Sequence, residues 1–286
     1  KIIFGIVVLL SVSFFIHIQF MKRKGNILDN IQFSASYSDK NDQLLQIFLT
    51  EDDKYRIFRP LEQYPPEFIE ALLMQEDKFF YTHAGVNFVA LVKAGWETYI
   101  KKSRRIGAST ITMQVAKLKY NLYTKNIPGK INQIIKAFYL ELCFSKDEIL
   151  EAYLNLAPVG GNVEGFETGA WYYFNKNIRQ LNLSEIIMLC VLPQNPIKRA
   201  PTTYRTPSEL ISARKILFET WIEKHPEDED KKIFMDMQMS VKCSFPNEAR
   251  HFTEMIYHEK KIKNEKSVVG KIVYRFDEGE IFTEYT

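Results

Sequence analysis

The chain has 286 residues, of which 46% are hydrophobic and 26% are charged, and its net charge at pH 7 is +3. This length can bury a substantial core, as one large domain or as one domain with a smaller lobe, and the composition excludes an intrinsically disordered chain. The three cysteines, Cys143, Cys190 and Cys243, show no CxxC pair and no metal-ligand spacing. Cys143 and Cys190 lie within apolar helical patterns, so we expect buried free thiols.

The chain opens with the apolar segment KIIFGIVVLLSVSFFIHIQF. Roughly 19 residues from Ile2 to Phe20 carry no formal charge, which is about the length that spans a bilayer. A cleaved signal peptide is the alternative, but the run is long and no small-residue cleavage site follows it. We therefore expect residues 1–20 to form a retained transmembrane helix. The flank MKRK alone would place the following side in the cytoplasm, but the chain begins at Lys1 rather than Met, so the residues leave the orientation open.

Residues 21–60 mix polar residues with short apolar stretches such as LLQIFL, and we expect a linker that contains a strand. Pro66 suits the first position of a helix that carries Glu76 and stops at Gly85. Four more helices are expected in the next part of the chain: FVALVKAGWETYI, ITMQVAKLKYNLY after a Ser109 or Thr110 cap, PGKINQIIKAFYLELCF, and ILEAYLNLA after a Ser145/Glu148 capping box.

The loop PVGGNVEG ends the last of these helices, and LSEIIMLCVLPQNP and TPSELISARKILFETWIEK predict two further ones. A capping box of Thr206 and Glu209 would begin the second of them. Beyond about Pro226 the pattern weakens to a charged loop, PEDEDKK, and an alternating segment, SVVGKIVYRF, that is typical of a strand. The main body, residues 61–225, is therefore expected to be mainly α, followed by a C-terminal extension over residues 226–286.

The stretch LLMQEDKFFYTHAG places a carboxylate on an apolar helical face. With a period near 3.6, Phe68, Leu72 and Phe80 fall on one face and Glu76 lies in its middle. One interpretation is a buried structural ion pair with the basic segment that follows. The other is a general acid or base whose pKa is raised by desolvation, with His83 two turns further on to orient or cap that face.

Positive charge is concentrated between Lys93 and Lys130, where nine basic residues accompany one acid, a net charge of +8 that leaves −5 for the rest of the chain. A solvated face is the usual explanation of such a run. An anionic partner, such as a phosphate, a pyrophosphate or an acidic membrane surface, also fits. No nucleic-acid recognition motif accompanies the charge, so we expect no nucleic-acid partner.

Four motifs occur in order along the chain: EDKFFYTHAG at 76–85, GASTITMQ at 107–114, SKDEILEAYLN at 145–155 and LPQNP at 192–196. Together they closely resemble the peptidoglycan glycosyltransferases, which are the transglycosylase domain of class A penicillin-binding proteins and its monofunctional relatives. YLNLAPVGGNVEG and the TMQ ending are most similar to the penicillin-binding protein 1C branch. The resemblance covers roughly Leu61 to Pro201 and implies a lysozyme-like helical fold with head and jaw lobes, here preceded by one transmembrane helix.

The resemblance implies an enzyme that polymerises lipid II, a disaccharide-peptide on undecaprenyl pyrophosphate, into glycan strands. Glu76 matches the family's catalytic glutamate, which would deprotonate the acceptor's 4-hydroxyl for attack on the donor's anomeric carbon with inversion. The family's diphosphate-binding residues match Ser109, Thr110, Gln114 and Lys117. The full set of expected substrate-binding residues is Asp77, Phe80, His83, Gly107, Ser109, Thr110, Gln114, Lys117, Lys130 and Asn155. On its own, GASTIT indicates a plain capped helix start, but beside Glu76 and the basic segment we interpret it as a set of donors for an anion.

One departure from the family pattern stands out. The family's RKxxE segment is GKINQ here, so Gln133 occupies the position of a second catalytic carboxylate while Lys130 is kept. A neutral amide binds a divalent cation less strongly than a carboxylate. We therefore predict no metal ligand, and a cofactor such as Mg²⁺ stays an open alternative.

The transpeptidase motifs of bifunctional relatives are not found: the lone SxxK match is SARK at 212–215, and neither SxN nor KTG occurs. The chain is then either a fragment of a longer protein or a monofunctional enzyme with a short extension.

Two other functions stay open. A lysozyme-like lytic enzyme also uses a lone glutamate on a helix, but it needs neither a diphosphate site nor an anchor. A catalytically weak scaffold that binds lipid II is favoured by Gln133. The expected partners are lipid II, the growing glycan strand, the cytoplasmic membrane and other cell-wall synthesis proteins. The resemblance implies a single-pass protein of the bacterial inner membrane with its catalytic domain on the periplasmic or extracytoplasmic side, contrary to the MKRK flank.

Overall fold

A computed structural model describes residues 25–39, 41–87 and 109–248, the strands 272–277 and 280–285, and residues 13, 250–251, 253–255 and 258. Three of the predicted features lie outside the described residues. They are the transmembrane helix over residues 1–20, of which Ser13 alone is described, the helix over residues 88–100, and Gly107. In the part of the chain that is described, no helix has both the length and the hydropathy that a membrane crossing requires. The chain divides into two compact units, one of Lys1–Asp29 and Phe79–Tyr153 and one of Asn30–Lys78 and Leu154–Thr286.

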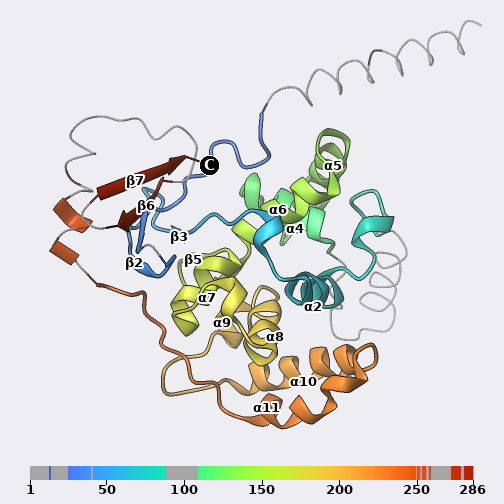
Figure 1. Ribbon diagram of the computed structural model, residues 1–286. Coiled ribbons are helices and arrows are strands. Elements are labelled where there is room, and N and C mark those ends of the chain that lie inside the picture. Colours follow the sequence, from blue (N-terminus) through green and yellow to red (C-terminus); the bar gives the residue numbers. More distant parts are fainter. Residues whose placement is uncertain are drawn as a thin grey trace, which may run out of the picture. The chain divides into compact units, whose positions relative to one another are not determined.

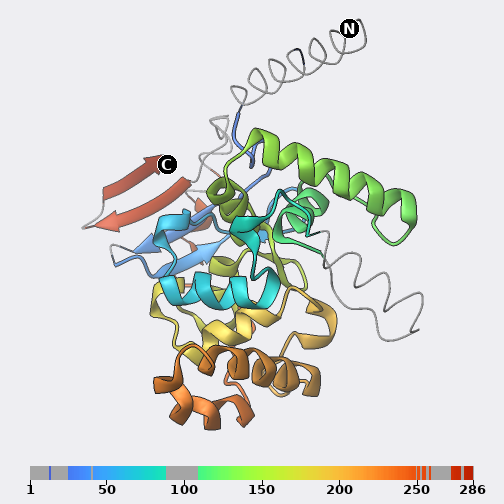
Figure 2. The same cartoon turned by 90° about the vertical axis from the view of Figure 1, so that its right-hand side faces the viewer.

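The first unit is helical. Its described helices are α4 (Ile111–Lys119), α5 (Ile127–Cys143) and most of α6 (Lys146–Leu156), with a short 3-10 helix at Phe80–Thr82. Thr110 caps α4 as predicted, accepting a hydrogen bond from the N–H of Met113 at 3.1 Å. The capping box that begins α6 is confirmed too, because Ser145 and Glu148 each bond the other's backbone N–H. Helix α5 is the longest of these helices (Figure 2, green), and it packs against α4.

The second unit is also mainly helical. Its described helices are α2 (Pro66–Glu76), α7 (Phe166–Phe174), α8 (Leu183–Val191), α9 (Pro196–Arg199), α10 (Ser208–Ile222) and α11 (Ile233–Asp236). Helix α8 is buried from Glu185 to Val191, which is the pattern of a helix enclosed by others. It packs against α2, α7 and α10, while α10 and α11 lie side by side (Figure 1). The mainly α fold class is therefore confirmed.

Two small sheets belong to this unit. The first has the order β3-β5-β4, from Tyr55–Arg56, Val163–Glu164 and Pro158–Gly160. The second has the order β2-β1-β6-β7, from Leu44–Ile47, Ser36–Asp39, Ile272–Asp277 and Glu280–Tyr285. The strands expected in LLQIFL and SVVGKIVYRF are thus confirmed. The segment PVGGNVEG is a β-hairpin rather than a loop, and Gly161 at its turn has a φ of +54°.

Two helix predictions are wrong. The helix that carries Glu76 ends there and not at Gly85, because Asp77 leaves the helical region with φ −162° and ψ 78°. Phe80 therefore lies in a separate 3-10 helix and does not extend the apolar face of α2. At α10 the predicted capping box does not form, since the hydroxyl of Thr206 instead accepts a hydrogen bond from the N–H of Met239 at 3.2 Å.

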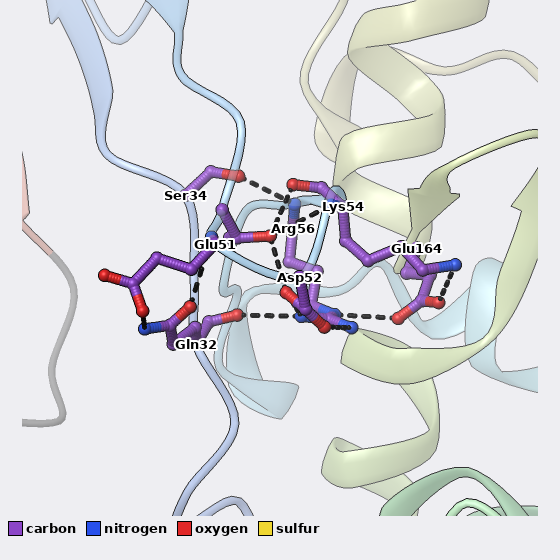
Figure 3. Close-up of polar contacts among 8 residues, drawn as sticks. Gln32, Ser34, Glu51, Asp52, Lys54, Arg56 and Glu164 are labelled. Carbon is purple, nitrogen blue, oxygen red and sulfur yellow. Dashed lines mark hydrogen bonds and ion pairs between the residues drawn. The ribbon is translucent and has the colours of Figure 1, made fainter.

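Arg56 links three segments of the second unit (Figure 3). Its guanidinium donates to Asp52 at 3.0 and 2.7 Å, to Glu164 at 2.7 Å and to the carbonyl oxygen of Gln32 at 3.1 Å. The hydrogen bond from Arg56 lowers the pKa of Asp52 below its usual range. Burial would lower the pKa of Arg56, but the two carboxylates outweigh it and raise that pKa. Lys54 makes a second ion pair with Glu164 at 2.9 Å.

We expect Arg56→Met to lower the free energy of unfolding by about 2–4 kcal/mol, because it removes one of the two cations paired with the largely buried Glu164 and leaves the carbonyl oxygen of Gln32 without that donor. Asp52→Asn should cost less than about 1 kcal/mol, since Asp52 is half exposed. The Asp52 contribution should be lost as the pH falls through the lowered pKa of that carboxyl group. Urea unfolding followed by circular dichroism measures both, and equal losses in the two variants would contradict the ranking.

Candidate functional site

Glu76 is the last residue of α2, in the second unit. The helix buries Phe68, Ala71 and Leu72, so the carboxylate follows directly after a buried apolar face. Asp77 closes the helix by donating its N–H to the carbonyl oxygen of Leu73 at 2.9 Å, and it is 8% exposed. The sequence therefore places Glu76 at a helix end, where its backbone is fixed by a cap and its side chain is half-buried.

Two groups from other helices of this unit respond to the charge of Glu76. The thiol of Cys190 in α8 is fully buried, and burial, followed by the negative charge of Glu76, raises its pKa. At the end of α9, burial lowers the pKa of Arg199, and Glu76 opposes that shift. The sequence analysis singled out neither residue for this site, because no spacing along the chain relates position 190 or 199 to position 76.

Lys130 of α5 is the centre of a polar cluster in the first unit. Its ammonium donates to the hydroxyl of Ser109 at 2.8 Å and to the side-chain oxygen of Gln133 at 3.0 Å. Both acceptors are neutral. Burial, and then the positive charge of Lys117 on α4, lowers the pKa of Lys130. Two cations held close together with neutral acceptors form an environment that favours an anion.

The neighbours of Gln133 fix the orientation of its amide group. The amide nitrogen donates to the carbonyl oxygen of Met113 at 2.6 Å, and the amide oxygen accepts from Lys130. In the reversed orientation the amide nitrogen would face the ammonium of Lys130, and the amide oxygen would face the carbonyl oxygen of Met113. One orientation alone therefore satisfies both contacts. The side chain is 2% exposed. These residues do not suit Mg²⁺, because the one amide oxygen already has a cationic partner and the two lysines would repel a divalent ion.

Several predicted binding residues of the first unit have structural contacts. The hydroxyl of Thr110 donates to the carbonyl oxygen of Gly85 at 2.6 Å in addition to capping α4. Phe80 is 1% exposed, and the ammonium of Lys146 lies 4.5 Å from its ring centroid. The same ammonium donates to the carbonyl oxygen of His83 at 2.7 Å. Substrate contacts by these residues stay predictions.

Gln114 and Asn155, two further residues predicted to bind substrate, also have partners within the fold. The side-chain oxygen of Gln114 accepts from the hydroxyl of Tyr153 at 3.3 Å, within the first unit. In the second unit Asn155 is fully buried, and its amide group bonds both the N–H and the carbonyl oxygen of Arg59, at 2.7 and 2.9 Å. Asn155 thereby holds the chain that leads into α2, and its contact with a glycan stays a prediction.

We expect Gln133→Glu to lower the free energy of unfolding by about 1–2 kcal/mol. The new carboxylate keeps Lys130 as a partner but turns its second oxygen toward the carbonyl oxygen of Met113, so two acceptors meet in a buried place. Asn132→Asp is the matched control, because it makes the same change at an exposed position of α5. Thermal unfolding with and without MgCl₂ measures the difference. A stabilisation by Mg²⁺ that is specific to Gln133→Glu would contradict our account of the site.

The sequence profile of the transglycosylase family matches residues 41–221. Penicillin-binding protein 1C of Escherichia coli (strain K12) is 38% identical over 172 residues, which cover 60% of this chain and 22% of that protein. Penicillin-binding protein 1A of Neisseria gonorrhoeae is 39% identical over 144 residues, 50% of this chain and 18% of that protein. Penicillin-binding protein 4 of Bacillus subtilis (strain 168) is 32% identical over 161 residues, 56% of this chain and 26% of that protein.

The chain thus spans between 18% and 26% of the length of these relatives. A crystal structure of penicillin-binding protein 1A from Haemophilus influenzae aligns with a TM-score of 0.41 at 17% identity, over 86% of this chain and 27% of that chain. A score of this size supports no argument about the fold. The family match, by contrast, covers more than half of the sequence and includes Glu76, Lys130 and Gln133. The chain therefore belongs to the transglycosylase family.

Proposed function

We propose that this chain is a peptidoglycan glycosyltransferase that polymerises lipid II into glycan strands and releases undecaprenyl pyrophosphate. The observation that carries the proposal is the family match over residues 41–221, which contains a carboxylate at a helix end and a cationic cluster. These are the two kinds of group that the reaction needs: a base for an alcohol and a stabiliser for an anionic leaving group.

Glu76 is the general base in this proposal. Its carboxylate takes the proton of the acceptor's 4-hydroxyl while that oxygen forms a bond to the donor's anomeric carbon. The bond from that carbon to the diphosphate oxygen breaks, and its electron pair leaves with the diphosphate. A fixed helix end suits this role, because the base must be held within hydrogen-bond reach of the hydroxyl.

Lys130, Lys117 and Ser109 bind the diphosphate of the donor. The ammonium of Lys130 is partly buried against neutral acceptors, so its charge is not cancelled before the substrate arrives. Negative charge grows on the leaving oxygen as the glycosidic bond breaks, and cations placed there in advance stabilise the transition state. Gln133 is not a metal ligand in this proposal, because the donors around it do not suit a divalent ion.

The proposal extends to the fold and to the location of the protein. Residues 61–225 form a lysozyme-like domain with head and jaw lobes, residues 1–20 anchor it in the membrane, and the domain lies outside the cytoplasm.

Helix α5 supports a membrane partner. Its exposed side carries Ile127, Ile131 and Ile135, which are 69%, 53% and 59% exposed, whereas Gln133, Ala137 and Leu140 are buried. A row of exposed isoleucines at a spacing of four residues, on a helix that also carries lysines, suits the lipid–water interface.

A second candidate is a lipid II-binding protein with little catalytic activity. Gln133 favours it, because the family's second carboxylate is missing and the amide that replaces it is held by two hydrogen bonds. Both functions require the diphosphate site, and they differ in whether Glu76 acts as a base.

We expect Glu76→Gln to reduce polymerisation of lipid II at least 100-fold, because the amide keeps the shape and cannot accept the proton. Glu67→Gln, an acid in the first turn of the same helix, serves as the control. Gel separation of glycan strands made by the detergent-solubilised chain measures the effect. Strands from the parent and not from Glu76→Gln support the enzyme. Lipid II bound but unchanged by the parent itself would favour the scaffold.

Lys130→Met should raise the KM for lipid II by roughly 10-fold or more, since a charge-assisted hydrogen bond to the diphosphate is lost. Lys125→Met, at an exposed position before α5, removes the same charge outside the cluster. Initial rates at limiting lipid II distinguish the two variants. Equal KM values would assign the effect to net charge and contradict a specific diphosphate contact.

A further inference from the structure

The last turn of α2 is connected to α9 by a chain of side-chain hydrogen bonds. Gln194 donates from its amide nitrogen to the carbonyl oxygen of Gln75 at 3.1 Å. Arg199 donates to the amide oxygen of the same Gln194 at 3.3 Å and to the carbonyl oxygen of Val191 at 2.6 Å. The guanidinium is thus attached to the end of α8 and, through one side chain, to the residue that precedes Glu76.

The same guanidinium lies within electrostatic reach of Glu76. Burial lowers the pKa of Arg199, and the charge of Glu76 is the opposing influence. Cys190 also responds to Glu76, but it is fully buried in α8 and has a raised pKa, so it stays neutral. Asp77 and Lys78 follow Glu76 in the chain. Arg199 is therefore a positively charged group of this unit whose pKa is influenced by Glu76.

We propose that Arg199 is a positioning residue for Glu76: it holds the last turn of α2 through Gln194, and its charge favours the ionised carboxylate that the base must carry. This inference rests on the proposed function of Glu76 and adds a residue to it. An arginine is suited to both tasks at once, because its planar group can donate to fixed acceptors in one direction and keep its charge at every working pH.

The contacts within α9 fix the backbone from which the side chain of Arg199 extends. The N–H of Arg199 donates to the carbonyl oxygen of Asn195 at 2.9 Å, and Asn195 caps the helix through its side chain. A merely structural arginine would affect folding alone. A positioning arginine changes in addition the pH at which Glu76 loses its proton, since removing a nearby positive charge makes the carboxylate harder to form.

The test compares the pH dependence of kcat/KM for strand formation in four variants of the full chain in detergent. Arg199→Gln removes the charge, Arg199→Lys keeps it, and Gln194→Leu breaks the link to α2 while keeping the charge. Arg205→Gln removes a positive charge from an exposed position of the same unit. We expect the acidic limb of Arg199→Gln to move up by about 0.5 to 1 pH unit. Arg199→Lys and Arg205→Gln should leave that limb in place, and Gln194→Leu should lower kcat without moving it.

A second readout does not depend on activity. Carbon-13 labelling of glutamate carboxyl groups allows Glu76 to be titrated by NMR, with Glu76→Gln identifying its signal. The same upward shift in Arg199→Gln is expected there. Unchanged titration in both measurements would overturn the inference. One further outcome separates the two proposals. If the parent chain makes no strands, but Arg199→Gln still raises the pKa of Glu76 in the NMR titration, the proposed function is overturned and the link between Arg199 and Glu76 is supported.

Discussion

The central interaction of the first unit is that of the ammonium of Lys130, which is partly buried and donates hydrogen bonds to uncharged acceptors. Removing a cation from water is costly unless an opposite charge or good hydrogen bonds replace the water. Ser109 and Gln133 supply the hydrogen bonds, and Lys117 adds a second positive charge instead of an opposite one. Such an arrangement gains most when an anion binds, because the described residues that accept hydrogen bonds from Lys130 do not neutralise its charge.

Two buried charged groups of the second unit, Arg56 and Glu167, have partners of opposite charge. Arg56 has two carboxylate partners, and the buried carboxylate of Glu167 accepts hydrogen bonds from Trp171, the N–H of Ile178 and Arg59. These groups are satisfied inside the fold, so we assign them to stability. Lys130 differs from both, because its hydrogen-bond acceptors are neutral.

Much of the fold could be predicted because its signals are local. The caps of α4 and α6 and the proline at the start of α2 each depend on residues within one helical turn. The end of α2 could not be predicted from the sequence, because Asp77 stops the helix although the apolar spacing continues to Phe80. Nor could the partner of Thr206, which is Met239, 33 residues away. At the candidate site, the match to the family's RKxxE segment pointed to Lys130 and Gln133. Arg199, by contrast, depends on the packing of α8 against α2 and on its hydrogen bonds to Val191 and Gln194.

Gln133 shows how an amide in place of a carboxylate changes the charge of a site while the hydrogen bond to Lys130 is kept. A carboxylate at this position would pair with Lys130 and cancel much of its charge, and a divalent ion could then restore the positive field. The amide makes the same hydrogen bond to Lys130 and leaves the ammonium charge intact, while its nitrogen satisfies the carbonyl oxygen of Met113. In the proposed reaction the lysines then meet the leaving diphosphate directly. In that proposal the cationic field at the leaving group comes from lysine side chains, and the amide of Gln133 leaves that field undiminished.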